Sequence, residues 1–202
     1  MKKSSGNSPF SAKSKNIPPV KKKREERNYL TPSEIEKIIA AIKKDGRYGL
    51  RNSALILLIF RHGFRSIEIS RLRWSDIDFR DSTINIRRVK GSKGGIHPIR
   101  SKELRLLRSL EKVRETEYVF ESERKTNLST RSIRNIVSKA GKLAKLEIDI
   151  SPHHLRHSCG YYLANNNIDT RGIQDYLGHR NIKNTVLYTE SSADRFKDFW
   201  DD

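Results

Sequence analysis

Residues 151–160 read Ser-Pro-His-His-Leu-Arg-His-Ser-Cys-Gly and are the most informative stretch of this chain. The opening Ser-Pro pair is typical of the start of a helix. On that helix His153, Arg156 and His157 stand three and four residues apart, so they share one face. Such a face contacts phosphate either as part of a catalytic site or as a binding surface that does not react, and the spacing alone leaves both alternatives open.

A metal site is the less favoured interpretation of the same histidines. The zinc-peptidase pattern needs a Glu directly after the first His, but His154 stands there and Arg156 adds a repulsive charge. The one cysteine, Cys159, has no partner for an intramolecular disulfide and lies in no structural zinc pattern. We therefore expect no metal and no cofactor, and a reducing, cytoplasmic location.

The charge of the chain indicates a polyanionic partner. Lys and Arg number 42 against 24 Asp and Glu, a formal net charge of +18. Residues 1–28 carry nine basic and two acidic residues, so we expect a flexible basic arm there, with Lys21, Lys22, Lys23 and Arg24 contacting the polyanion, and a folded domain over residues 29–202.

The sequence predicts neither a membrane span nor a secretory signal. The longest apolar run, residues 54–60, has seven residues, whereas a membrane-spanning helix needs about 20. The first residues are basic but lead into polar ones instead of an apolar stretch. We expect no membrane partner.

The periodicity predicts a mainly α-helical fold with a small antiparallel β-sheet. Apolar residues at helical spacing and capping signals predict helices beginning at 31–34, over 48–62 and 67–72, around 104–110 and 133–144, from 151, between 169 and 178, and an amphipathic end with Phe196, Phe199 and Trp200. Residues 82–89 and 96–100 predict two strands of a hairpin, whose turn over residues 90–95 is basic.

Two more stretches are informative only in combination with residues 151–160. Arg65 follows a Gly break and precedes Glu68 by three residues, so the carboxylate can orient the guanidinium. Leu-Gly-His ends at His179, and Tyr188 follows nine residues later. Each pattern is weak alone, but their order around Lys90 of the hairpin turn is specific.

In these elements the sequence resembles the catalytic domain of the tyrosine recombinases, also called the phage integrase family. The resemblance extends over about residues 29–200, and residues 155–160 and 173–182 resemble the short recombinases that invert fimbrial promoter segments. It implies a DNA breaking-rejoining fold and a site-specific recombinase that acts through a covalent 3′-phosphotyrosine, without the separate N-terminal domain that most members carry.

The resemblance also implies a role for each site residue. Tyr188 is the expected nucleophile, although physics alone does not select it among seven tyrosines. Arg65 and Arg156 are expected to hold the phosphate oxygens, as planar guanidinium groups do well. His153 and His179 add hydrogen bonds, and His153 also assists proton transfer, with Glu68 in support. Lys90 protonates the leaving 5′ oxygen, with Lys93 as the rival candidate, and the expected DNA contacts come from the following residues: Lys90, Lys93, Arg180 and the basic arm.

The expected partner is double-stranded DNA with paired recombination sites, bound by a homotetramer with the help of accessory DNA-bending proteins. A C-terminal segment containing Phe196 and Trp200 can pass to a neighbouring protomer or pack within its own chain. Two alternatives remain open: a type IB topoisomerase-like enzyme, and an inactive DNA-binding regulator of the same fold.

Overall fold

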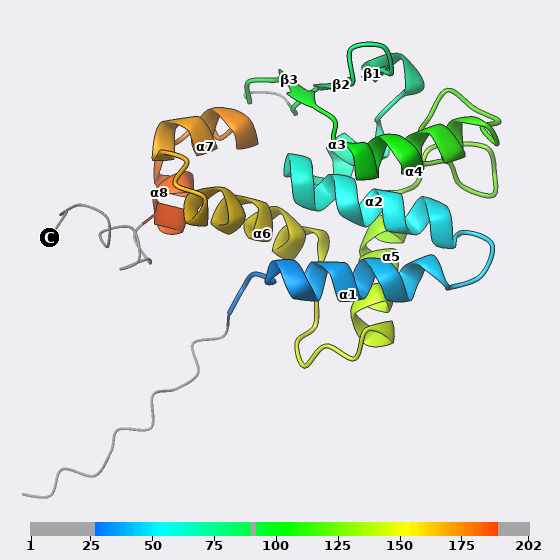
Figure 1. Ribbon diagram of the computed structural model, residues 1–202, viewed down its shortest axis with the longest axis horizontal. Coiled ribbons are helices and arrows are strands. Elements are labelled where there is room, and N and C mark those ends of the chain that lie inside the picture. The colour runs from blue at the N-terminus through cyan, green and yellow to red at the C-terminus, as the bar shows by residue number, and fades with distance from the viewer. Residues whose placement is uncertain (1–26, 90–91, 190–202) are drawn as a thin grey trace, which may run out of the picture.

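The computed structural model describes residues 27–89 and 92–189, and this part of the chain is mainly helical. A small sheet accompanies the helices, which confirms the expected fold class (Figure 1). The elements in chain order are α1 (Pro32–Lys43), α2 (Gly49–His62), α3 (Ser66–Ser70), η1 (Trp74–Asp76), β1 (Ile77–Asp78), β2 (Thr83–Ile86), β3 (Gly95–Pro98), α4 (Ser101–Glu111), α5 (Thr130–Leu143), α6 (Pro152–Asn165), α7 (Thr170–Leu177) and α8 (Lys183–Thr189).

Helix α2 is the centre of the main core. Residues 52–60 are all buried, which explains why this segment is apolar around most of its circumference. Helices α1, α4 and α6 pack against it, and Figure 1 shows α2 between α1 and α4. The helix predicted over residues 48–62 is therefore confirmed.

The predicted boundaries of the first two helices are also observed. At the start of α1 the Thr31 hydroxyl accepts from the Glu34 N–H at 3.3 Å, and the Glu34 carboxylate accepts from the Thr31 N–H at 2.8 Å. Helix α2 ends at Gly63, whose φ of +59° is left-handed and favours glycine.

The sheet has the order β1-β2-β3, with both pairs antiparallel, and Ile84 lies opposite His97. Strand β2 is shorter than the predicted 82–89, because the chain leaves the ladder at Arg87 and the side chain of Arg88 turns into the interior. The sequence did not predict β1 or α8. Lys90, residues 1–26 of the basic arm, Phe196, Phe199 and Trp200 lie outside the described residues.

Helices α6, α7 and α8 form a second, smaller core at one end of the molecule (Figure 1). Its buried members are Cys159, Ala164, Ile173, Leu177 and Tyr188. Asp169 caps the start of α7 by accepting from the N–H of Gly172, as the sequence predicted. This small core therefore fixes α8 against α6 and α7.

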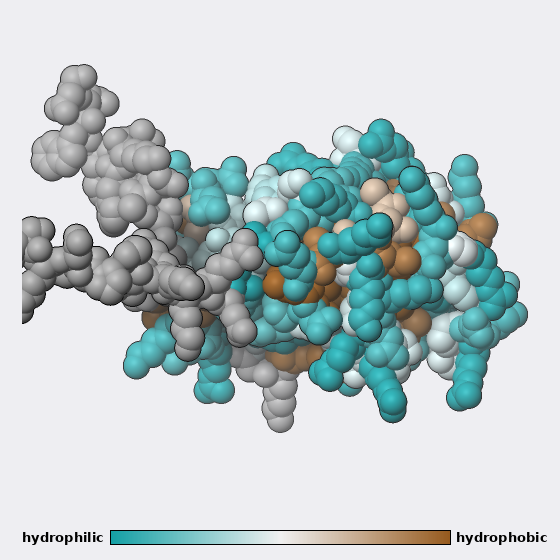
Figure 2. Space-filling view, turned by 90° about the horizontal axis from the view of Figure 1, so that it is seen from below, coloured by the Kyte–Doolittle hydropathy of each residue, from teal (hydrophilic) through white to brown (hydrophobic). Residues whose placement is uncertain are grey.

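Hydrophilic side chains cover most of the described surface in the view of Figure 2, with only small hydrophobic patches between them. Among the described helices, none combines the length and the apolar character that a membrane crossing requires.

Two glycines with similar backbone angles provide a test of how tightly the two cores join. Gly46 and Gly63 have φ of +61° and +59°, but a Cβ on Gly46 meets nothing within 4 Å, whereas one on Gly63 overlaps the side chain of Leu177. We expect Gly46→Ala to cost about 1–2 kcal/mol through backbone strain alone. Gly63→Ala should cost about 1–3 kcal/mol more through overpacking. Denaturant unfolding measures both, and equal losses would contradict this packing.

Candidate active site

Glu68 organises one side of the site. Its carboxylate is buried and accepts from the Arg65 N–H at 2.9 Å, from Arg65 Nη1 at 2.7 Å and from Arg88 Nη1 at 2.8 Å. Burial acts to raise the pKa of Glu68, but the Arg88 charge and the hydrogen bonds from Arg65 outweigh it and hold the pKa below its usual value. The ionised carboxylate therefore orients Arg65, as the sequence predicted.

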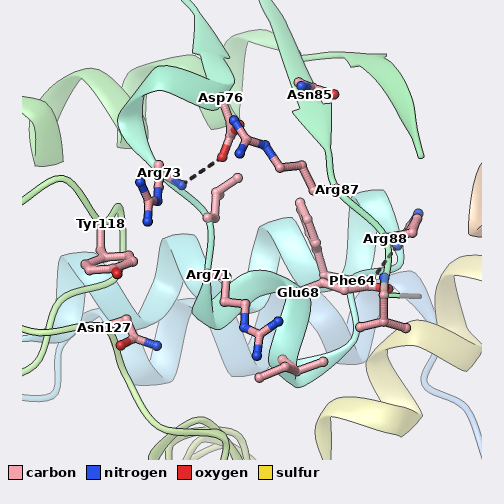
Figure 3. Close-up of a pocket in the computed structure, with 13 residues that line it drawn as sticks. Phe64, Glu68, Arg71, Arg73, Asp76, Asn85, Arg87, Arg88, Tyr118 and Asn127 are labelled. Atoms are coloured by element: carbon pink, nitrogen blue, oxygen red, sulfur yellow. Dashed lines mark hydrogen bonds and ion pairs between the residues drawn. The ribbon is translucent and has the colours of Figure 1, made fainter. Parts of the chain in front are cut away.

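Arg88 is a site residue that the sequence analysis missed. Its guanidinium is buried beside Glu68 (Figure 3) and also donates to the backbone oxygens of Gly63, His62 and Tyr176 at 2.8–3.0 Å. These acceptors belong to the end of α2 and to α7. Arg88 therefore joins the segment after β2 to both cores, and no local sequence pattern signals contacts with such distant partners.

Arg156 is a second buried cation that binds the backbone oxygen of Gly63. From α6 its Nη1 donates to the Gly63 oxygen and its Nη2 donates to the Leu177 oxygen at 2.8 Å. Among the described residues no carboxylate forms an ion pair with it. Burial, followed by the charges of Arg65 and Arg88, lowers the pKa of Arg156 to about 10, so it stays protonated at neutral pH.

Tyr188 lies in α8 with only 3% of its surface exposed. Its hydroxyl is 3.1 Å from Nδ1 of His157, and Nε2 of His157 is 2.6 Å from Nε2 of His153. The ring packs on Gly160, where a Cβ would stand 2.6 Å from two ring carbons. Burial raises the pKa of Tyr188 to about 12 although the Arg156 charge opposes this shift. The phenol is therefore neutral until another group removes its proton.

His179 follows α7 and lies beside the same tyrosine. Its ring is inclined by 19° to that of Tyr188, with centroids 6.2 Å apart, and its Nδ1 is 2.8 Å from the hydroxyl of Thr185 in α8. No hydrogen-bond partner of Nε2 is found within the part of the chain that the structure describes. Burial and the charges of Arg156 and other neighbours lower the pKa of His179 to about 4, so the imidazole is neutral.

The hairpin of β2 and β3 approaches the site over Gly178. A Cβ at Gly178 would stand 2.7 Å from the backbone oxygen of Lys93 and 3.0 Å from Cγ of Arg88, and φ of +66° also favours glycine here. The side chains of Lys93 and Arg180 are exposed. Arg88 and Lys93 therefore both lie beside Gly178 at the end of α7.

The structure brings together all the predicted catalytic residues that it describes. Arg65 and Arg88 share Glu68, Arg88 and Arg156 share the Gly63 oxygen, and His157 links His153 to Tyr188. Glu68 is paired with two arginines, and Arg156 binds only backbone oxygens among the described residues, so the site has excess positive charge and suits an anion. The sequence placed His157 on the face of His153 and Arg156 but did not predict its contact with Tyr188.

Known proteins resemble this chain over most of its length. A model of the phage integrase family matches residues 28–195. Type 1 fimbriae regulatory protein FimB of Escherichia coli (strain K12) is 48% identical over 181 residues, which cover 87% of this chain and 90% of that protein.

Two solved structures share the fold. A crystal structure of XerA recombinase has a TM-score of 0.74 and 29% identity, covering 85% of this chain and 63% of that one. XerH site-specific recombinase bound to difH substrate, in a pre-cleavage complex, has a TM-score of 0.73 and 25% identity, covering 84% of this chain and 52% of that one. This chain thus spans less than two thirds of either. From the family match and the identity to FimB, the chain is a tyrosine recombinase and belongs to the phage integrase family.

Proposed function

We propose that this tyrosine recombinase inverts a short DNA segment that carries a promoter, by cleaving and rejoining double-stranded DNA at paired sites through Tyr188. The observation that carries the proposal is the buried Tyr188 hydroxyl, which contacts His157, the residue directly after Arg156, a cation without a carboxylate partner in the described chain. A phosphodiester resists nucleophiles because its oxygens are anionic, and fixed cations offset that charge in the transition state. The similarity to FimB supports inversion as the outcome.

In the proposed reaction the Tyr188 oxygen attacks the phosphorus and forms the 3′-phosphotyrosyl bond, while the bond from phosphorus to the 5′ oxygen breaks. Arg65 and Arg156 bind the non-bridging oxygens, and Nε2 of His179 donates to one of them. Lys90 gives its proton to the leaving 5′ oxygen, with Lys93 as the alternative donor on the same turn. A 5′ hydroxyl then attacks the phosphotyrosine and rejoins a strand, so the phosphodiester energy is conserved.

His157 is the group in this proposal that takes the proton from Tyr188. The phenol has no other acceptor among the described residues, so its hydrogen points at Nδ1 of His157. The hydrogen of the neutral imidazole is then on Nε2 and is donated to Nε2 of His153. His153, which we expected to assist proton transfer directly, acts behind His157 by fixing its tautomer.

The DNA complex in this proposal is a homotetramer on paired sites, assisted by DNA-bending proteins, in the bacterial cytoplasm. Residues 1–28 act as a basic arm through Lys21, Lys22, Lys23 and Arg24, and residues 29–202 form the catalytic domain. Arg180 and Lys93 are exposed near the site and add contacts to the DNA backbone.

Replacement of the nucleophile tests the reaction. We expect Tyr188→Phe to bind DNA but to form no covalent adduct with nicked DNA from the flanks of the gene, since the attacking oxygen is gone. Denaturing gels with and without protease measure the adduct. Wild-type adduct with relaxation of unrelated plasmid would indicate a topoisomerase instead, and an adduct from Tyr188→Phe would show that another residue attacks.

The proton acceptor is tested by His157→Gln, with His154→Gln as the matched control on the same helix. We expect a loss of about 10²–10⁴-fold in the cleavage rate for His157→Gln, the usual contribution of a general base. Burial, followed by the charges of His153, His154 and Arg156, lowers the pKa of His157 to about 4 from 6.5. A bound phosphate would oppose this shift. Wild-type cleavage should therefore fall with decreasing pH between 6.5 and 4.

This acid limb should be absent from the residual activity of His157→Gln, because glutamine does not titrate. His154 contacts Ser151 at the start of α6, so His154→Gln should keep the wild-type pH profile. A His157→Gln enzyme with the wild-type rate and profile would contradict the assignment.

The basic arm is tested by deleting residues 2–24, which leaves the ion pair between Arg27 and Glu34 intact. We expect weaker DNA binding and a flatter salt dependence, since each lost phosphate contact reduces the log–log slope by about 0.9. Titrations at several salt concentrations measure the slope. An unchanged slope would exclude the arm from DNA binding.

A further inference from the structure

A cavity of about 710 Å³ lies next to the active site. It lies on the side of Glu68 away from the second, smaller core, which contains Tyr188. It is bounded by α3, η1, β2 and the loop over residues 118–127 (Figure 3). Four arginines line it, together with the following polar residues: Glu68, Asp76, Asn85, Tyr118 and Asn127. The excess of cations over carboxylates on its walls favours an anionic ligand.

Two of the four arginines have a carboxylate of their own: Arg87 pairs with Asp76 at 2.6 Å, and Arg73 pairs with Glu117 at 2.9 Å. Arg88 pairs at 2.8 Å with Glu68, a carboxylate that it shares with Arg65. Arg71 is exposed, and its side chain makes no ion pair or hydrogen bond with the described residues. In Figure 3 its guanidinium lies between Arg88 on one side and Tyr118 and Asn127 on the other. Arg71 is therefore the cation that is free to bind a ligand.

Neutral hydrogen-bond donors complete this cavity. The amide of Asn127 donates one hydrogen to the hydroxyl of Ser70 at 2.7 Å, which leaves its second hydrogen available. The hydroxyl of Tyr118 has no hydrogen-bond partner within the described ranges, and its ring lies under the guanidinium of Arg73 at 5.5 Å. A charged fork with amide and hydroxyl donors around it matches the oxygens of a phosphate.

The position of Arg71 identifies the source of that phosphate. Arg65 and Arg71 flank the two ends of α3, and six residues of helix correspond to about 9 Å along its axis. The phosphates of one DNA strand rise ~3.4 Å per nucleotide along the duplex axis and lie farther apart than this through space, because the strand also winds around the axis. We propose that Arg71 binds a backbone phosphate of the same strand, about one or two nucleotides from the phosphate that Arg65 holds. This inference rests on the proposed function, since it assumes that Arg65 faces the cleaved phosphate.

The first test compares Arg71→Gln with Arg105→Gln, which removes an exposed arginine on α4 outside the cavity. With full-length protein and DNA that contains the recombination site, the log–log salt slope should decrease by about 0.9 for Arg71→Gln, and Arg71→Lys should restore it. An unchanged slope for Arg71→Gln, or an equal decrease for Arg105→Gln, would overturn the proposal.

The second test locates the phosphate. One phosphate at a time in the cleaved strand is replaced by an uncharged methylphosphonate, and affinity is measured for wild type and for Arg71→Gln. At one position, about one or two nucleotides from the cleavage site, wild type should lose affinity and Arg71→Gln should lose no more. Equal losses in both proteins at every position would refute the assignment.

A titration with inorganic phosphate distinguishes a site for a free anion from a site for a DNA phosphate. If phosphate raises the melting temperature of wild type but not of Arg71→Gln, while the methylphosphonate scan shows no difference, the cavity is a site for a small anion and the proposal is wrong. All of these measurements report binding, so they can also be made in a Tyr188→Phe background. Failure of the proposed function is detected separately, because Tyr188→Phe would then still form the covalent adduct with DNA.

Discussion

The backbone oxygen of Gly63 is the acceptor on which the site depends, because it receives a hydrogen bond from Arg88 and another from Arg156. Two buried guanidinium groups repel each other, and shared carbonyl acceptors hold them in place without cancelling their charge. Gly63 can offer this oxygen because α2 ends there in a left-handed turn. The end of one apolar helix thus determines where the cations of α6 and of the hairpin meet.

Burial is the largest cause of the low pKa of His157 and His179, because it disfavours the charged imidazole. Neighbouring cationic groups add to this effect, mainly histidines at His157 and mainly arginines at His179. Both rings are therefore neutral. In the proposed reaction His157 accepts a proton and His179 donates a hydrogen bond, and the bound phosphate diester supplies the negative charge that the site lacks.

Much of the fold was predictable because its signals are local. The capping box at Thr31 and the glycines after α2 and α7 act within a few residues of themselves, and the sequence placed these boundaries correctly. The seven residues of α8 have no comparable pattern, and their position comes from packing against α6 and α7. Arg88 was missed for the same reason, since one of its acceptors, Tyr176, lies 88 residues away.

The candidate site contains contacts that local sequence patterns do not predict. Helical spacing placed His153, Arg156 and His157 on one face, but only the packing of α8 on α6 decides which of them meets Tyr188. Gly160 permits that packing, because any larger residue would occupy the space of the tyrosine ring. The contact between His157 and Tyr188 is thus a consequence of one small residue a single helical turn away, and a sequence pattern of the polar side chains alone does not reveal it.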